Sequence, residues 1–154
     1  MLTTSTSHLA KAGLFAAASV LLGTCVMFLS AGRGDALEEV SALLETSETI
    51  VGQPISYPTG SPAKVTAAIV TMPPGGTTGW HEHAVPLFGY MLEGEITVDY
   101  GPHGKRVYRK GDSLMEAINM AHDGHNTGKG IARILAVFMG AEGIGNTTKV
   151  APPK

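Results

Sequence analysis

From residue 50 onward, glycine and proline divide the chain into short apolar or alternating segments. Alternation of apolar and polar residues is typical of a β-strand with one buried face. The sequence holds 20 glycines and 9 prolines, and only 16% of its residues are charged, so its composition favours turns over long charged helices. We therefore predict an all-β sandwich or barrel. Its expected strands are residues 49–57, 64–72, 87–92, 95–100, 105–108, 113–118 and 131–138.

The first 36 residues differ in character from the rest. Residues 14–31 carry no charge, follow a polar segment that contains Lys11, and end in small residues. This pattern is typical of a secretory signal peptide, although about 18 apolar residues also suit a short membrane anchor. A buried core helix is a further alternative. We expect residues 1–36 to be a cleaved signal or a retained anchor, and the protein to be exported, either periplasmic or secreted.

The length and charge of the chain limit what it can bind. A chain of 154 residues amounts to about one domain of ~100–200 residues, which we place at residues 37–154. A net charge of −2 provides no field that attracts nucleic acid, so we expect no such partner. Cys25 is the only cysteine, which excludes an intramolecular disulfide and zinc sites with several thiolates. Any transition-metal site would be built from the six histidines and the carboxylates.

One short segment has helical rather than strand spacing. Leu37, Val40, Leu43 and Leu44 lie at i, i+3, i+6 and i+7. This spacing predicts a short N-terminal amphipathic helix that packs over the end of a sheet. Further along, residues 99–105 are typical of a hairpin loop and residues 109–112 of a tight turn.

Two short segments carry candidate metal ligands. His81 and His83 are two residues apart, so on a strand both side chains would face one side and Glu82 the other. His122 comes from a second segment, residues 111–126. Three neutral imidazoles that converge in a small barrel suit Fe(II), Mn(II), Ni(II), Cu(II) or Zn(II) and leave positions for a substrate or dioxygen.

The spacing of these residues resembles the two signature motifs of the cupins, which are small jelly-roll barrels. The residues in register with the motifs are Gly75, His81, His83 and Gly94 in the first, and Gly111, His122 and Asn126 in the second. The resemblance covers about residues 65–140. It implies a double-stranded β-helix that binds one divalent metal through His81, His83 and His122, with a small organic molecule as substrate or ligand.

The sequence departs from the family pattern at the metal site. Leu87 stands where cupins usually supply a carboxylate ligand, and Ala117 and Asn119 replace the proline and glycine of the second motif. The site therefore resembles the three-His variants of the family, such as cysteine dioxygenases and acetylacetone-cleaving dioxygenases. This resemblance favours Fe(II), a weaker metal affinity, and an anionic or enolate-forming substrate that binds the metal directly.

The resemblance also suggests residues around the metal. Asn126 is expected to brace the loop that carries His122. Glu116 is expected to hydrogen-bond behind a ligand or to lie at the surface, with replacement of the missing carboxylate as the alternative. Tyr90 and Met120 are candidates for lining the cavity. We expect His125 to have a structural or supporting role.

Three functions remain open at this stage. The first is metal-dependent, dioxygenase-like oxidation of a small organic molecule, and the second is non-catalytic binding of a small ligand or metal. The third is a metal-assisted isomerase or lyase, which needs a base from Glu116, His125 or Tyr90. Because cupins commonly dimerise through N-terminal strands, the resemblance also implies a homodimer formed by residues 49–57.

Overall fold

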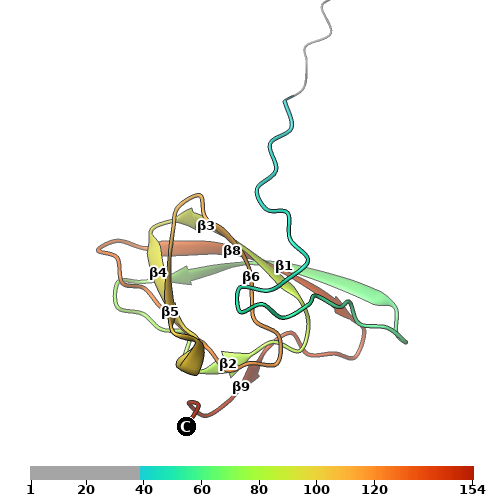
Figure 1. Ribbon diagram of the computed structural model, residues 1–154. Coiled ribbons are helices and arrows are strands. Elements are labelled where there is room, and N and C mark those ends of the chain that lie inside the picture. The colour runs from blue at the N-terminus through green and yellow to red at the C-terminus, as the bar shows by residue number, and fades with distance from the viewer. Residues whose placement is uncertain (1–38) are drawn as a thin grey trace, which may run out of the picture. The chain divides into compact units, whose positions relative to one another are not determined.

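The computed structural model describes residues 39–154, and the predicted signal or anchor lies outside this range. The described part is almost entirely β-structure, as the sequence predicts (Figure 1). The strands are β1 (Ala63–Met72), β2 (His81–Glu82), β3 (Leu87–Glu93), β4 (Glu95–Asp99), β5 (Lys105–Arg109), β6 (Ser113–Met115), β7 (Asp123–His125), β8 (Ala132–Ala141) and β9 (Thr148–Lys149), with a 3-10 turn at Gly101–His103. Within residues 39–154, no helix is long and apolar enough to cross a membrane.

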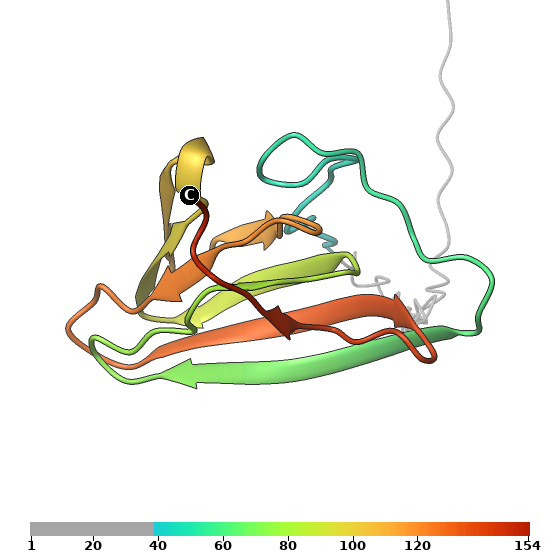
Figure 2. The ribbon, with the colours of Figure 1, turned by 90° about the horizontal axis from the view of Figure 1, so that it is seen from below.

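The strands form three antiparallel sheets. The largest has the order β1-β8-β3-β6, the second has the order β5-β4-β7, and β2 pairs with β9. Strands that are far apart in the sequence are neighbours, since β1 pairs with β8 over ten residues and β4 with β7. The two larger sheets enclose the core, in the manner of a jelly roll (Figure 2).

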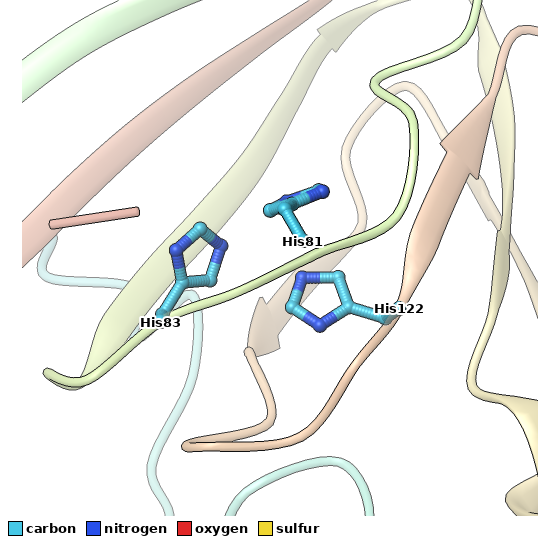
Figure 3. A group of neighbouring side chains, drawn as sticks. All are labelled: His81, His83 and His122. Atoms are coloured by element: carbon cyan, nitrogen blue, oxygen red, sulfur yellow. The ribbon is translucent and has the colours of Figure 1, made fainter. Parts of the chain in front are cut away.

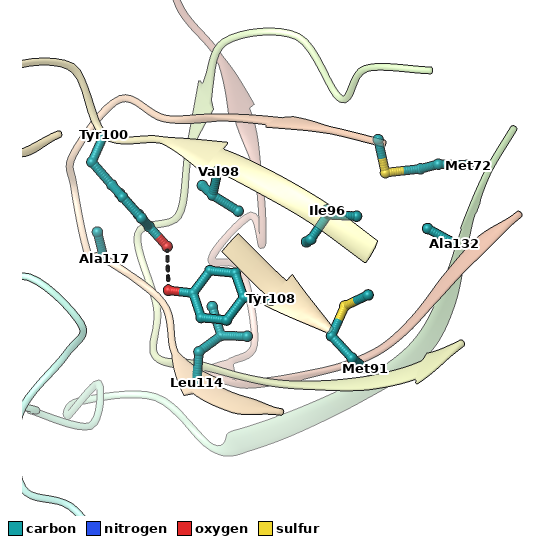
Figure 4. Packing of buried hydrophobic residues seen from close by; sticks show 9 residues of the cluster. All are labelled: Met72, Met91, Ile96, Val98, Tyr100, Tyr108, Leu114, Ala117 and Ala132. Carbon is teal, nitrogen blue, oxygen red and sulfur yellow. Dashed lines mark hydrogen bonds between the residues drawn. The ribbon is translucent and has the colours of Figure 1, made fainter. Parts of the chain in front are cut away.

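Alternating side chains build this core, because successive residues of a strand point to opposite faces. In β3 the residues Leu87, Gly89 and Met91 are buried, and in β4 Ile96 and Val98 are buried. The cluster shown in Figure 4 consists of Met72, Met91, Ile96, Val98, Tyr100, Tyr108, Leu114, Ala117 and Ala132.

Six of the expected strands are confirmed as β1, β3, β4, β5, β6 and β8, although β6 ends earlier than expected, at Met115. The expected turn at residues 109–112 is also present, where the Asp112 N–H donates to the Arg109 carbonyl oxygen at 2.9 Å. The strand expected at residues 49–57 is wrong. There the Thr49 N–H bonds to the Gln53 carbonyl oxygen, and Pro54 has no N–H to continue a ladder.

The expected N-terminal helix is also wrong for its described part. Residues 39–47 contain no helix, and Val40 and Leu43 are 87% and 60% exposed. A helix this short is stabilised mainly by packing of its apolar face, and here most of the surface of Val40 and Leu43 is left exposed. Leu37 lies outside the described residues.

Candidate metal centre

The structure brings together the three histidines that the sequence singles out. His81 begins β2, His83 follows this strand, and His122 immediately precedes β7. Their potential ligand atoms all lie within 4.8 Å of one another, and each side chain is buried. Figure 3 shows the three rings gathered around a common point, with ring centroids 4.4 to 5.0 Å apart.

Backbone pairing explains why these side chains converge. His81 and His122 face each other across an isolated antiparallel bridge. His81 also pairs with Lys149 of β9, so two remote segments hold the strand that carries the first ligands. The side chain of Glu82 is not among those that line the cavity, in agreement with the expected alternation.

Hydrogen bonds fix which nitrogen of each ring is free. In all three histidines Nδ1 lies within hydrogen-bond distance of a backbone carbonyl oxygen. The pairs are His81 with Gly79 (2.7 Å), His83 with Asn146 (2.9 Å) and His122 with Met120 (2.8 Å). Because a carbonyl oxygen can only accept, each Nδ1 carries the hydrogen, and each neutral ring keeps a lone pair on Nε2.

Burial keeps these rings neutral. Desolvation lowers the pKa of His81 and His122, and it lowers the pKa of His83 to about 3. The Nε2 atom of His122 is buried without a hydrogen-bond partner within the described residues, which is costly for a polar atom. Neutral imidazoles with a buried, unpartnered lone pair fit a divalent transition metal.

The three histidines form part of the wall of a cavity of about 220 Å³. Most of the remaining wall is apolar and comes from both large sheets. These apolar residues are Val70, Leu87, Ile96, Val98, Leu114, Ile134 and Ala136. Polar groups come from Thr78, Thr147, Glu116 and Lys149, and the Lys149 ammonium donates to the carbonyl oxygen of Thr78.

Glu116 lies inside this cavity, directly after β6, and is 6% exposed. Its Oε2 is 3.8 Å from Nε2 of His122, and its Oε1 accepts the Ala117 N–H at 2.8 Å. Burial raises the pKa of Glu116 to about 7, although hydrogen bonds from Ala117 and Tyr100 oppose this rise. A titratable carboxyl group therefore lies beside the histidine cluster.

The side chain of Asn126 supports a part of the fold next to the histidine cluster. Its Nδ2 donates to the carbonyl oxygens of Met72 and Gly130, both at 2.9 Å, and its Oδ1 accepts the Gly128 N–H. These bonds join the end of β1 to the turn after β7. The expected bracing role thus applies to this turn and not to the segment before β7.

Two expectations about the cavity wall need correction. Tyr90 does not line the cavity, because it alternates with Leu87, Gly89 and Met91, which face inward. The side chain of Met120 is also absent from the wall, and only its carbonyl oxygen takes part, as the acceptor for His122.

His125 points away from the cluster, with its side chain 46% exposed and its Nε2 3.1 Å from Oδ2 of Asp123. Sequence reasoning missed Thr147 and Lys149, which reach the cavity only because β9 pairs with β2. A two-residue strand near the C-terminus gives no periodic signal that could have revealed them.

These observations define the class as a small β-barrel with a buried three-His cluster on the wall of an apolar cavity. Comparison by sequence places residues 68–138 in the cupin domain family. The match identifies this segment of the chain as a cupin domain. Comparison with curated proteins gives no match.

Several solved structures are similar to part of the chain. Oxalate decarboxylase from Lactobacillus farciminis, in a formate complex, is 24% identical over 56% of this chain and 26% of its own, with a TM-score of 0.49. A mutant of the Bacillus subtilis oxalate decarboxylase is 23% identical over 56% and 24%, with a TM-score of 0.47. A predicted oxalate decarboxylase from Thermotoga maritima is 27% identical over 47% and 64%, with a TM-score of 0.43. The match thus spans about a quarter of the length of the first two proteins.

Proposed function

We propose that the protein is a metal-dependent, dioxygenase-like oxidoreductase that acts on a small organic molecule. The observation that carries this proposal is the convergence of three buried histidines, each with its Nδ1 bound to a carbonyl oxygen, on the wall of an apolar cavity. His81, His83 and His122 would hold one divalent ion, with Fe(II) as the first candidate and Mn, Ni, Cu or Zn as alternatives. Such an ion supplies Lewis acidity toward the substrate and a position for dioxygen.

The cavity wall determines which molecules can enter. Its volume of about 220 Å³ lies below the ~300–1,000 Å³ of most ligand pockets, so the substrate is small. The apolar side chains exclude water and bind the hydrocarbon part of the molecule. In this low-dielectric space, interactions with charge are stronger than they are in water.

Lys149 supports an anionic or enolate-forming substrate. It is the only lysine or arginine among the described residues that line the cavity. It belongs to β9, which pairs with the strand that carries His81. A carboxylate or enolate that enters the cavity would therefore meet a cation as well as the histidine cluster.

A metal-assisted isomerase or lyase is the second candidate function, and Glu116 is the observation in its favour. Of the three possible bases, Glu116 lines the cavity, whereas Tyr90 and His125 do not. A carboxyl group beside the metal ligands could move a proton on a bound substrate without any oxidant.

The decisive experiment loads the purified full-length protein with Fe(II) and measures dioxygen uptake. The panel contains small diketones, thiols and carboxylic acids, with an anaerobic arm for each compound. Dioxygen uptake matched to substrate loss, and absent in His81→Gln, supports the proposal. Anaerobic turnover indicates the isomerase or lyase, and metal binding without any turnover indicates a non-catalytic binding protein.

Substrate charge is tested separately with Lys149→Met. The expected result is a raised KM for anionic substrates with little change in kcat, because Lys149 would attract the anion without touching the reacting atoms. Lys64→Met is the matched control, since Lys64 is an exposed residue of β1 outside the cavity.

A further inference from the structure

We infer that Glu116 is a fourth metal ligand, so that this chain supplies from the end of β6 the carboxylate that is missing at Leu87. The inference rests on the proposed metal-binding function. It replaces the three-His site expected from the sequence with a site of three imidazoles and one carboxylate.

The first argument is the position of Glu116 relative to Leu87. The Glu116 N–H donates to the Leu87 carbonyl oxygen at 2.9 Å, so Glu116, directly after β6, is a backbone neighbour of Leu87 on the adjacent strand β3. Both side chains line the same cavity. Leu87 on β3 thus stands where cupins usually supply a carboxylate. Glu116, directly after the neighbouring strand β6, supplies a carboxylate to the same cavity.

The second argument is the distance between the carboxylate and the histidine cluster. In zinc sites the metal–nitrogen and metal–oxygen distances are about 2.0–2.2 Å, so two ligand atoms on one ion lie at most ~4.4 Å apart. The 3.8 Å between Glu116 Oε2 and His122 Nε2 falls within this limit. This contact is also longer than a hydrogen bond, and His122 Nε2, which has no other partner within the described residues, is free to bind an ion. Glu116 lies outside the group whose ligand atoms are all within 4.8 Å of one another, so its carboxylate would move toward His81 and His83 when an ion binds.

The third argument is burial. Among residues 39–154, the one ion-pair contact of Glu116 is with His122, and Nε2 of that histidine has no hydrogen-bond partner there. The Ala117 N–H holds the other carboxyl oxygen, Oε1, and thereby directs Oε2 toward the cluster. A buried carboxylate without a cation is costly, and a bound metal ion would relieve this cost for both residues.

The chemical consequence is a change of charge at the site. A carboxylate ligand removes one positive charge from the complex relative to three neutral imidazoles. It is also a hard oxygen ligand, which suits Mn(II) and Fe(II) better than a soft ion such as Cu(I).

The test uses Mn²⁺ and the full-length protein, with two readouts that do not depend on turnover. The first is the dissociation constant of Mn²⁺, and the second is the electron paramagnetic resonance spectrum of the bound ion, which responds to its ligand set. Glu116→Gln keeps the size of the side chain but removes its charge. Glu82→Gln is the matched control, because it removes the same charge from a residue that lies between two ligands in sequence but does not line the cavity.

We expect Glu116→Gln to weaken Mn²⁺ binding by at least ~10-fold and to change the spectrum, whereas Glu82→Gln stays close to the parent in both. Weaker binding with an unchanged spectrum would overturn the inference, since Glu116 would then only position His122. An unchanged affinity would overturn it as well. If Mn²⁺ does not bind the parent, or binds a His81→Gln variant equally well, the proposed metal centre itself fails. This result differs from a failure of the Glu116 inference alone, in which the parent binds Mn²⁺ through the histidines.

Discussion

The backbones of His81 and His122 hydrogen-bond to each other in both directions. The His81 N–H donates to the His122 carbonyl oxygen at 3.0 Å, and the His122 N–H donates to the His81 carbonyl oxygen at 2.9 Å. Such a reciprocal pair fixes two facing residues of an antiparallel ladder. Ligands from two separate motifs are thus held opposite each other by the protein backbone.

This pairing predicts that metal binding stabilises the protein without refolding it. At free metal 100-fold above Kd, the gain is about 2.7 kcal/mol. For a domain of this size we expect Tm to rise by roughly 10 °C, at about 4 °C per kcal/mol. Calorimetry with and without metal measures the shift, and far-UV circular dichroism is expected to stay unchanged. A large spectral change on metal addition would contradict a site formed in advance.

Acid is predicted to destabilise the metal-free protein. The pKa values of the three histidines are lowered by burial, that of His83 to about 3, so the unfolded chain binds more protons below about pH 6.5. The contribution of these three histidines to the free energy of unfolding is complete above pH 6.5 and is lost as the pH falls. The raised pKa of Glu116, about 7, has the opposite sign between pH 7 and 4.5 and offsets part of this dependence there.

Urea unfolding between pH 7 and pH 3.5 measures this dependence. Each excess proton on the unfolded chain contributes a slope of about 1.4 kcal/mol per pH unit. His83→Gln should lower this slope by the contribution of one proton, about 1.4 kcal/mol per pH unit, over pH 6.5–3.5. An identical slope in parent and variant would show that His83 is not held neutral.

Asn126→Ala is predicted to destabilise the fold while leaving the metal site intact. Asn126 is buried and satisfies three backbone groups, and an unsatisfied buried group costs about 1–3 kcal/mol. We expect a loss of about 2–3 kcal/mol in the free energy of unfolding, with unchanged metal stoichiometry. Thr127→Ala, at an exposed neighbour, should stay within about 0.5 kcal/mol of the parent. Loss of metal in a folded Asn126→Ala protein would show that the turn supports the ligands directly.

Gly94→Ala is predicted to lower the free energy of unfolding more than an alanine substitution at another glycine with positive φ. Gly94 has φ +76°, and a Cβ there would lie 2.5 Å from the Ile131 carbonyl oxygen. Gly52 has φ +80° with open space around it, so Gly52→Ala measures the conformational cost alone, about 1–2 kcal/mol. We expect Gly94→Ala to cost at least ~2 kcal/mol more than this control in chemical denaturation, since backbone must move. Equal costs would mean that the contact with Ile131 is easily relieved.

The sequence predicts the parts of this fold that have their own periodic signal. The long strands β1, β3, β4 and β8 alternate or are apolar, and they form where expected. Strands β2, β7 and β9 have two or three residues each, and they exist only through their partners elsewhere in the chain. The segment at residues 49–57 has apolar character, yet Pro54 and a local turn prevent it from joining a sheet.

The candidate site also has a part that the sequence predicts and a part that it does not. Motif spacing was sufficient to bring His81, His83 and His122 together, because a shared backbone arrangement underlies that spacing. The direction of Glu116 depends on where β6 ends and on the bond from Ala117, which no pattern in the sequence specifies. Tyr90 has the size of a cavity residue, but the register of β3 turns it to the other face of the sheet.

Metal analysis of the purified full-length protein, prepared without chelator or a polyhistidine tag, tests the central claim most directly. The parent should contain about one equivalent of a single transition metal, and His122→Gln should lose it while remaining folded. His125→Gln, at an exposed histidine outside the cluster, should keep the metal. A parent that takes up no transition metal, or equal loss of metal in both variants, would contradict a metal centre built on His81, His83 and His122.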